Sequence, residues 1–230
     1  MIRTVAETGS TNADLIAEAH AGAPEGLWLR AESQTGGRGR VGRSWQSPPG
    51  NLYASTIVRL HGGDPPAATL ALVAAVALEE VATAYVGPGR LQLKWPNDLM
   101  AGHAKVAGIL LERAGDAVVI GFGVNLARHP ENLERPTASL AVIGSAAPQA
   151  DTFLIDLAEA FARWLSRWRS EGLEPVRSRW LRAAHPIGSA LKAGEVEGLF
   201  EGLDLEGALL LRRADGRIVT IRAGDVFLSI

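Results

Sequence analysis

The sequence contains no cysteine. Disulfide bonds, thiolate metal sites and cysteine nucleophiles are therefore excluded. An excess of one charge is also missing, because 23 Lys and Arg residues face 25 Asp and Glu residues, giving a net charge of −2. A protein that coats nucleic acid is usually basic as a whole, so the charge balance argues against that class.

Long uncharged hydrophobic runs are absent as well. Residues 1–12 lack the apolar core of a signal peptide. The most apolar run, residues 67–86, contains Glu79 and Glu80 and is typical of a buried helix rather than a membrane span. We therefore expect a cytoplasmic protein that does not bind membranes.

Lysine is scarce. Of the 23 basic residues only Lys94, Lys105 and Lys192 are lysine, and the rest are arginine. In such a chain, a lysine indicates a position that needs a compact, strongly hydrated ammonium rather than a wide guanidinium. The five histidines are scattered without the spacing of metal ligands, so we expect no metal bound directly by the protein.

What the sequence does have is a cationic, glycine-rich segment at residues 34–45, QTGGRGRVGRSW. Glycines let the backbone approach a ligand closely, and the forks of Arg38, Arg40 and Arg43 suit carboxylate and phosphate oxygens. The segment predicts a mobile loop that closes over a small anion. A solvated surface turn, or an arginine-glycine tract that touches RNA, is the alternative.

Periodicity indicates an α+β fold, with a mixed sheet flanked by helices. Thr11 and Asp14 fit a capping box, so a helix should begin there. Strands are expected at residues 26–33, 51–60, 91–95, 105–113 and 117–126, and further helices at 67–86, 152–170 and 174–184. Three tryptophans on the last two helices are expected to be core: Trp164, Trp168 and Trp180.

The pattern of hydrophobic and turn-forming residues changes after Pro186. Four short alternating segments are broken by turns at 205–207, 214–216 and 223–225, which predicts a compact barrel of short strands. We therefore expect one domain over residues 1–185 and a small C-terminal β-barrel over 186–230.

Three further motifs carry polar or flexible residues into this sheet. Residues 94–99, KWPNDL, place Lys94, Asn97 and Asp98 around a turn, where Asn and Asp often bond the local backbone. Lys105 begins an otherwise apolar strand and needs an anionic partner or an open cleft. Gly121 and Gly123 inside a strand indicate a ligand or another backbone pressed close. Neither a dinucleotide fingerprint nor a Walker loop is present.

Five segments in this order closely resemble the biotin–protein ligases: Ser10-Thr11-Asn12, GRGRVGRSW, KWPNDL, KVAGILLE and GFGVNL. The resemblance covers most of residues 8–126, and the family pattern also includes a small SH3-like C-terminal barrel. It implies an ATP-dependent ligase that activates biotin as biotinyl-5'-AMP and transfers it to a lysine of a biotin carboxyl carrier protein domain.

The resemblance assigns roles to individual residues. The polar head of biotin falls to Ser10, Thr11, Asn12 and Gln34, and Arg38, Gly39 and Arg40 fall on the adenylate-binding loop that also contacts biotin. Lys105 falls on the lysine between the reacting carboxylate and the phosphate, so Lys105, Arg38 and Arg40 are the expected catalytic residues. The nucleotide side is assigned, besides Arg38 and Arg40, to Arg43, Trp45, Lys94, Asn97, Asp98 and Asn125.

The resemblance also bears on substrates and partners. ATP and biotin are expected as substrates, with Mg²⁺ carried by the ATP phosphates. The motifs begin about ten residues into the chain, so no DNA-binding domain and no DNA binding are expected. A homodimer through sheet edges is plausible for the family. The barrel could close over ATP or receive the carrier, and Asp98 is a conceivable base for the transfer step.

Two other functions stay open at this point. A related ligase could use lipoate or another acyl chain, although GRGRVGRSW together with KWPNDL argues against it. A non-catalytic RNA- or phosphate-binding module would need a broader basic surface with exposed aromatic side chains.

Overall fold

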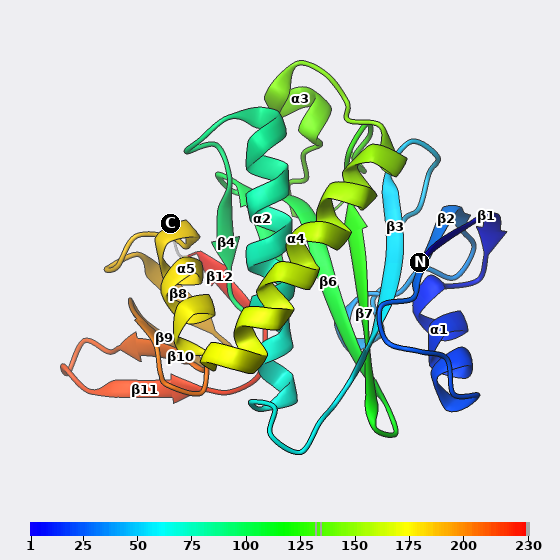
Figure 1. Cartoon of the computed structure of the whole chain (residues 1–230). Helices are drawn as coiled ribbons and strands as arrows, with labels where there is room; N and C mark the ends of the chain where they lie inside the picture. Colours follow the sequence, from blue (N-terminus) through cyan, green and yellow to red (C-terminus); the bar gives the residue numbers. More distant parts are fainter. Residues whose placement is uncertain (132, 134, 229–230) are drawn as a thin grey trace.

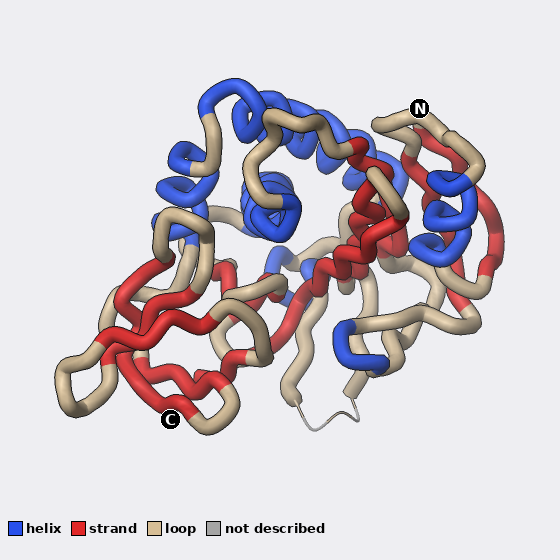
Figure 2. Tube along the Cα trace, turned by 90° about the horizontal axis from the view of Figure 1, so that it is seen from below, coloured by secondary structure: helices blue, strands red, loops and turns tan. Residues whose placement is uncertain are grey.

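The chain forms a seven-stranded sheet covered by helices and, beside it, a five-stranded sheet (Figures 1 and 2). The computed structural model describes residues 1–131, 133 and 135–228. The large sheet has the order β1-β2-β3-β7-β6-β5-β4, and all of its pairs are antiparallel except β1 with β2. Its strands are β1 (Ile2–Thr8), β2 (Trp28–Gln34), β3 (Leu52–Arg59), β4 (Gln92–Lys94), β5 (Asp98–Ala101), β6 (Ala104–Ala114) and β7 (Ala117–Val124).

The two faces of the large sheet bury different helices. Successive side chains of a strand point to opposite faces. Accordingly, Val118 of β7 belongs to the core under the long helices, whereas Val119 packs with Leu15 of α1. The helices are α1 (Thr11–His20), α2 (Leu70–Val86), α3 (Leu140–Gly144), α4 (Ala150–Glu171) and α5 (Glu174–Ala183). The face that carries α1 is the one on which the candidate site lies.

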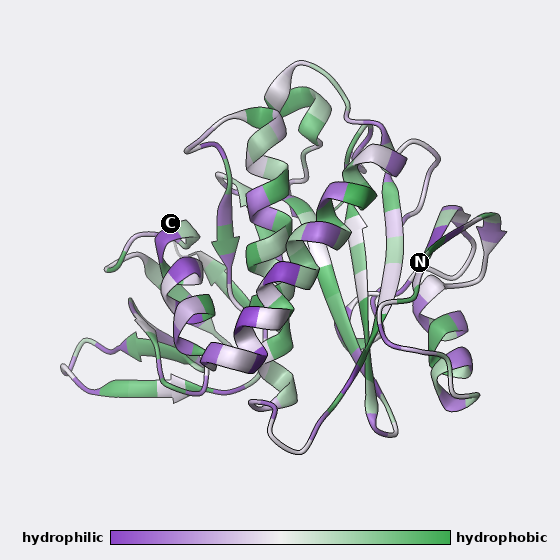
Figure 3. Ribbon diagram, in the orientation of Figure 1, coloured by the Kyte–Doolittle hydropathy of each residue, from purple (hydrophilic) through white to green (hydrophobic). Residues whose placement is uncertain are grey.

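Helix α2 is the apolar helix that the sequence predicted. Within the described residues, the segment Ala67–Val86 is long and apolar enough to cross a membrane, but 67% of that stretch is buried inside the protein. It packs against α4 and the sheet, and most of its residues are buried. Figure 3 shows mostly apolar residues on the visible side of α2 and polar residues along the outer face of α4. The expected core tryptophans on α4 and α5 are buried: Trp164, Trp168 and Trp180.

Three elements of this part of the chain were not predicted: the strands β1 and β5 and the helix α3. β1 is an edge strand with mostly exposed, polar side chains, so it has little apolar alternation to reveal it. β5 lies where the sequence suggested only a turn, and it completes a hairpin with β4 through the cis peptide Trp95–Pro96. Helix α3 has five residues, which is too short for a clear helical period in the sequence.

The start of α1 differs from the prediction in its cap. Ser10, not Thr11, is the N-cap residue, and its hydroxyl accepts a hydrogen bond from the Ala13 backbone N–H at 3.4 Å. Thr11 is the first helical residue. Its hydroxyl is therefore free to hydrogen bond outside the helix.

The five-stranded sheet confirms the small C-terminal β-structure. Its order is β11-β10-β9-β8-β12, with all pairs antiparallel. The strands are β8 (Ala190–Ala193), β9 (Val196–Leu203), β10 (Leu209–Arg212), β11 (Ile218–Ile221) and β12 (Val226–Leu228). The sequence missed β8, which has four residues. A domain boundary near residue 186 stays a prediction.

Candidate functional site

A cavity of about 420 Å³ opens on the α1 face of the large sheet. It is bounded by the N-terminus of α1, the arginine-rich loop, β5 to β7 and the start of β12. Every residue that the sequence assigned to the site lines this one cavity: Ser10, Thr11, Asn12, Gln34, Arg38, Gly39, Arg40, Arg43, Trp45, Lys94, Asn97, Asp98, Lys105 and Asn125.

One end of the cavity is a neutral hydrogen-bonding network. The backbone N–H and the hydroxyl of Thr11 donate to Gln34 Oε1 at 2.9 and 3.2 Å, and Gln34 Nε2 donates to Ser47 Oγ at 3.2 Å. Ser55 Oγ lies 2.7 Å from the Thr11 hydroxyl. These bonds orient the Gln34 amide and leave hydroxyl and amide groups at a helix N-terminus, where a neutral ring with both donors and acceptors can bind.

Asn12 connects this network to the sheet. Its Oδ1 accepts from Ser55 Oγ at 2.6 Å, and its Nδ2 donates to Glu112 Oε2 at 2.8 Å. A Cβ atom at Gly121 would lie 2.2 Å from Asn12 Oδ1. The glycine is therefore needed because the Asn12 side chain presses on the strand, whereas the sequence suggested a ligand or a backbone.

Trp45 lies across the neighbouring part of the sheet. Gly108 of β6 and Gly123 of β7 are direct partners in the sheet, and Cβ atoms there would lie 3.3 and 2.6 Å from the indole. The buried indole N–H has no hydrogen-bond partner among the residues that the structure describes. The glycine pair thus lets a flat aromatic ring lie on the sheet with one donor unused.

The other end of the cavity is cationic. Asp98 lies between two lysines, with Oδ1 2.5 Å from Lys105 Nζ and Oδ2 2.9 Å from Lys94 Nζ. Burial raises the pKa of Asp98, but the charges of Lys105 and then Lys94 outweigh burial and hold that pKa below its usual value. The cluster carries one net positive charge, which favours an incoming anion.

The segment Gly37–Trp45, which we call the flap, is a small hairpin over the cavity. Arg38 and Ser44 form an antiparallel bridge, Gly39 N–H donates to Arg43 O at 2.7 Å, and Trp45 N–H donates to Gly37 O at 2.9 Å. At its tip, Val41 has a left-handed backbone with φ of 56° and is 84% exposed. Few backbone bonds therefore hold the flap.

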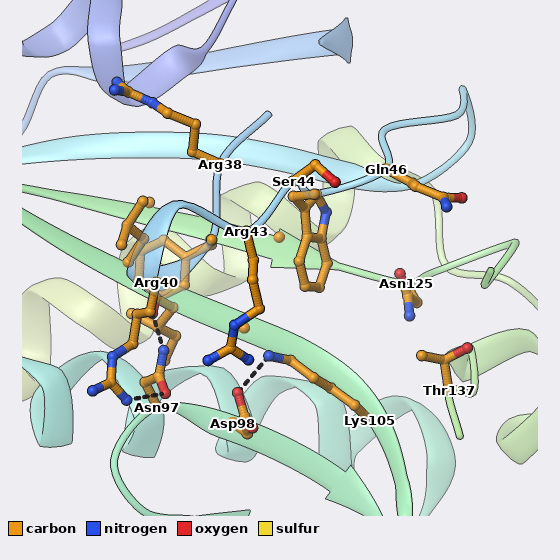
Figure 4. Close-up of a pocket in the computed structure, with 18 of the residues that line it drawn as sticks. Arg38, Arg40, Arg43, Ser44, Gln46, Asn97, Asp98, Lys105, Asn125 and Thr137 are labelled. Atoms are coloured by element: carbon orange, nitrogen blue, oxygen red, sulfur yellow. Dashed lines mark hydrogen bonds and ion pairs between the residues drawn. The ribbon is translucent and has the colours of Figure 1, made fainter. Parts of the chain in front are cut away.

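The three flap guanidiniums do not converge on one point (Figure 4). Arg38 extends away from Lys105 and lies 3.8 Å from Glu112 Oε1. Arg40 donates to Asn97 Oδ1 at 3.3 Å and to the Gly224 carbonyl at 3.1 Å. Arg43 forms an ion pair with Asp225 and points toward the end of the cavity that holds Lys105.

The two asparagines bond backbone carbonyls outside their own turns. Asn97 Nδ2 donates to the Ile109 carbonyl at 2.5 Å, and Asn125 Nδ2 donates to the Ala138 carbonyl at 3.1 Å. The expectation that a turn Asn bonds the local backbone is therefore wrong for Asn97, whose partner belongs to β6. Asp98 bonds the two lysines instead.

Several residues of the cavity or of the network that supports it escaped the sequence analysis. Ser55, which is buried against Thr11 and Asn12, lies in a mostly apolar strand, and Asp225, which lines the cavity, belongs to the distant barrel, so neither gave a signal. Glu112 ends the KVAGILLE motif and could have been singled out as its acidic residue. Arg135 and Thr137 also line the cavity. Over the described parts of the chain, no group of three or more His, Asp or Glu residues could hold a metal.

Known proteins share both the sequence and the fold. Residues 8–125 match the biotin/lipoate A/B protein ligase family, and residues 190–229 match the biotin protein ligase C-terminal domain. A biotin–[acetyl-CoA-carboxylase] ligase of Paracoccus denitrificans is 41% identical, covering 97% of this chain and 98% of its own. The bifunctional ligase/repressor of Escherichia coli is 36% identical, covering 86% of this chain and 65% of its own.

A solved structure agrees over the whole fold. The biotin protein ligase of Aquifex aeolicus, in complex with biotin and ATP, has a TM-score of 0.89 at 26% identity and covers 99% of both chains. The sequence match spans both the α/β part and the barrel, and the cavity lies where these two parts meet. The chain therefore belongs to the biotin–protein ligases of the biotin/lipoate A/B protein ligase family.

Proposed function

We propose that this enzyme joins biotin to a lysine of a biotin carboxyl carrier protein domain in two steps, by way of biotinyl-5'-AMP. The observation that carries the proposal is the single cavity with a neutral amide and hydroxyl end and a cationic end. Biotin and ATP together match both ends, because biotin carries a neutral polar ring and a carboxylate and ATP carries a triphosphate.

The neutral end suits the ureido ring of biotin. Thr11, Asn12 and Gln34 present hydroxyl and amide groups that can both donate and accept, and Ser10 closes the helix N-terminus beside them. These groups are already bonded to one another through Ser55, so they are oriented before the ligand arrives. Preorganisation of this kind lowers the cost of binding.

The first step brings two anions together. A carboxylate oxygen of biotin attacks the α-phosphorus of ATP, the bond from that phosphorus to the bridging oxygen breaks, and pyrophosphate leaves with the electron pair. Lys105, held by Asp98 at the cavity wall, can neutralise the carboxylate and the phosphoryl oxygens, and Arg40, which donates to Asn97 in the same cavity, supplies a second cation. Loss of one such donor typically costs about 3 kcal/mol of transition-state stabilisation.

In the second step the carrier amine attacks the acyl carbon, and AMP leaves with the electron pair of the broken C–O bond. The amine must first lose a proton. Asp98 is a poor acceptor for it, because the two lysines lower the pKa of its carboxyl group. We assign Asp98 to holding Lys94 and Lys105, and we expect the proton to go to solvent.

The charges at the site indicate how Mg²⁺ is bound. The carboxylates of Asp98 and Asp225 are engaged by lysine and arginine side chains, so the site offers cations to the phosphates. Mg²⁺ is therefore expected to enter with ATP, held by phosphate oxygens and water.

We also propose a cytoplasmic location, which the cysteine-free sequence supports.

Transfer to a carrier domain tests the function. Purified protein, ATP, Mg²⁺ and a biotin carboxyl carrier domain are incubated with biotin or lipoate, and intact-mass spectrometry follows the carrier. A mass increase of one biotinyl group, absent when the acceptor lysine of the carrier is changed to arginine, is the expected result. Modification by lipoate in preference to biotin would contradict the proposal.

A further inference from the structure

Besides its own hairpin and its contacts with the large sheet, the flap is held by the C-terminal barrel. Arg43 pairs with Asp225, and Arg40 Nη1 lies 3.6 Å from the other oxygen of the same carboxylate. Arg40 also donates to the Gly224 carbonyl at 3.1 Å. Two flap guanidiniums therefore converge on two consecutive barrel residues that lie more than 180 positions away in sequence.

The barrel side of this contact is firmly anchored. Asp225 immediately precedes β12, whose first residue, Val226, is 1% exposed and pairs with Ala193 of β8. Asp225 and Val226 both line the cavity wall. The carboxylate thus stands on a backbone that is fixed by sheet pairing and core packing.

Without this contact, the flap is held at its end by Trp45 on the sheet and by the contacts of Arg38 with Glu112 and of Arg40 with Asn97, while its tip has little support. Its backbone bonds are short-range, and its tip residue Val41 is exposed and in a left-handed conformation. Regions with few buried apolar contacts open at low free-energy cost. The ion pair between Asp225 on the cavity wall and Arg43 on the flap therefore stabilises the closed form of the flap relative to the open form.

We propose that Asp225 is a positioning residue that, through Arg43, keeps the flap closed over biotinyl-5'-AMP and directs Arg40 into the cavity. The inference rests on the proposed function, since it names the anhydride as the retained ligand. Asp225 takes no part in bond making. Its loss frees the flap, so the anhydride escapes and reacts elsewhere, where any lysine amine attacks the acyl carbon and AMP leaves.

Release of the intermediate tests this role. Biotinyl-5'-AMP carrying a radiolabel is formed on the enzyme, excess unlabelled biotin and ATP are added, and the bound label is followed by rapid gel filtration. Asp225→Asn should release it about two- to fivefold faster, the range for losing an exposed ion pair. Asp225→Glu should be close to the parent. The matched control is Asp215→Asn, in a turn of the same barrel, whose carboxylate contacts Arg217 of its own turn.

Two more readouts separate positioning from general damage. In a double-mutant cycle with Arg43→Gln, the effects on release should be non-additive, because either change breaks the same pair. Release from the parent should also accelerate with salt, whereas release from Asp225→Asn should respond less. The cycle applies equally if Asp225→Asn lowers stability, because additive effects would then identify damage unrelated to Arg43.

The outcomes distinguish this inference from the proposed function. Adenylate formation by the parent with equal release from parent and Asp225→Asn would overturn the role of Asp225 alone. Additive effects in the cycle would overturn it too. Failure of the parent to form any adenylate would instead contradict the proposed function.

Discussion

At the residue scale, three glycines shape the site because their missing side chains leave room for neighbouring groups. Gly121 makes room for Asn12, and the paired Gly108 and Gly123 make room for Trp45. The sequence could predict a close approach at Gly121 and Gly123 because glycine weakens a strand interior. It could not identify the approaching groups, because Asn12 and Trp45 lie far from them along the chain.

This arrangement predicts that two alanine substitutions in β7 affect different substrates. In Gly121→Ala the new methyl group displaces Asn12, so the KM for biotin should rise about tenfold. In Gly123→Ala the methyl group displaces Trp45, so the KM for ATP should rise about tenfold. Overpacking of this kind costs typically about 1–3 kcal/mol. Steady-state kinetics of carrier biotinylation measures both constants. Equal effects on both substrates in both variants would contradict separate ends of the cavity.

The cluster of Lys94, Asp98 and Lys105 predicts a stability effect. Asp98→Asn leaves two poorly exposed ammonium groups without their carboxylate, so the free energy of unfolding should fall by about 3 kcal/mol. Adding Lys94→Met should restore part of the loss. Urea denaturation at pH 7 measures the change, and a loss below about 0.5 kcal/mol, the size of an exposed pair, would contradict a buried network.

The same cluster predicts a pH dependence with a definite sign. The folded-state pKa of Asp98 lies below its ordinary value of 3.8, so its contribution to stability is present above that value and is lost as the pH falls through the folded-state pKa. The parent should therefore lose its stability advantage over Asp98→Asn as the pH falls below about 4. Urea titrations at pH 7 and pH 3 compare the two, and an advantage that persists unchanged at pH 3 would contradict the ion pairs.

At the element scale, periodic segments could be predicted and irregular ones could not. The apolar α2, the amphipathic α4 and the strands β2, β3, β6 and β7 lie close to their expected positions because their burial patterns are strong. The exposed edge strand β1 has no comparable pattern. The three-residue β4 and four-residue β5 form a hairpin whose turn chemistry alone was visible in the sequence.

The flap is the element with the clearest stored strain. Val41 is a β-branched residue with φ of 56°, where a non-glycine residue costs about 1–2 kcal/mol. Asparagine tolerates this conformation, and the exposed valine side chain has little packing to lose. Val41→Asn should therefore raise the thermal midpoint by about 2–4 °C, the change that about 1 kcal/mol produces in a chain of this size.

The control for the flap substitution is Val142→Asn, an exposed valine within helix α3. Because α3 offers no left-handed strain to relieve, this variant should show no gain. Differential scanning calorimetry compares the two. An equal or lower midpoint for Val41→Asn would mean that the flap tip does not hold this conformation in the folded protein.

At the scale of the whole molecule, the site is assembled from parts that are distant in sequence. The α1 face of the sheet supplies the neutral end, the β4–β5 hairpin and β6 supply the lysines, and the barrel supplies Asp225. The family resemblance named most residues of the first two groups, although not Ser47 and Ser55 of the neutral network. The barrel residue could not be predicted, because Asp225 and Arg43 are 182 positions apart and an isolated aspartate in a turn carries no signal of its partner.

If the cavity joins biotin to AMP before any carrier arrives, the enzyme should exchange labelled pyrophosphate into ATP in the absence of carrier. This exchange should require biotin, and it should fall about a hundredfold or more in Lys105→Ala, as for loss of one preorganised donor. Exchange that proceeds without biotin, or that Lys105→Ala leaves intact, would contradict this role of the cavity.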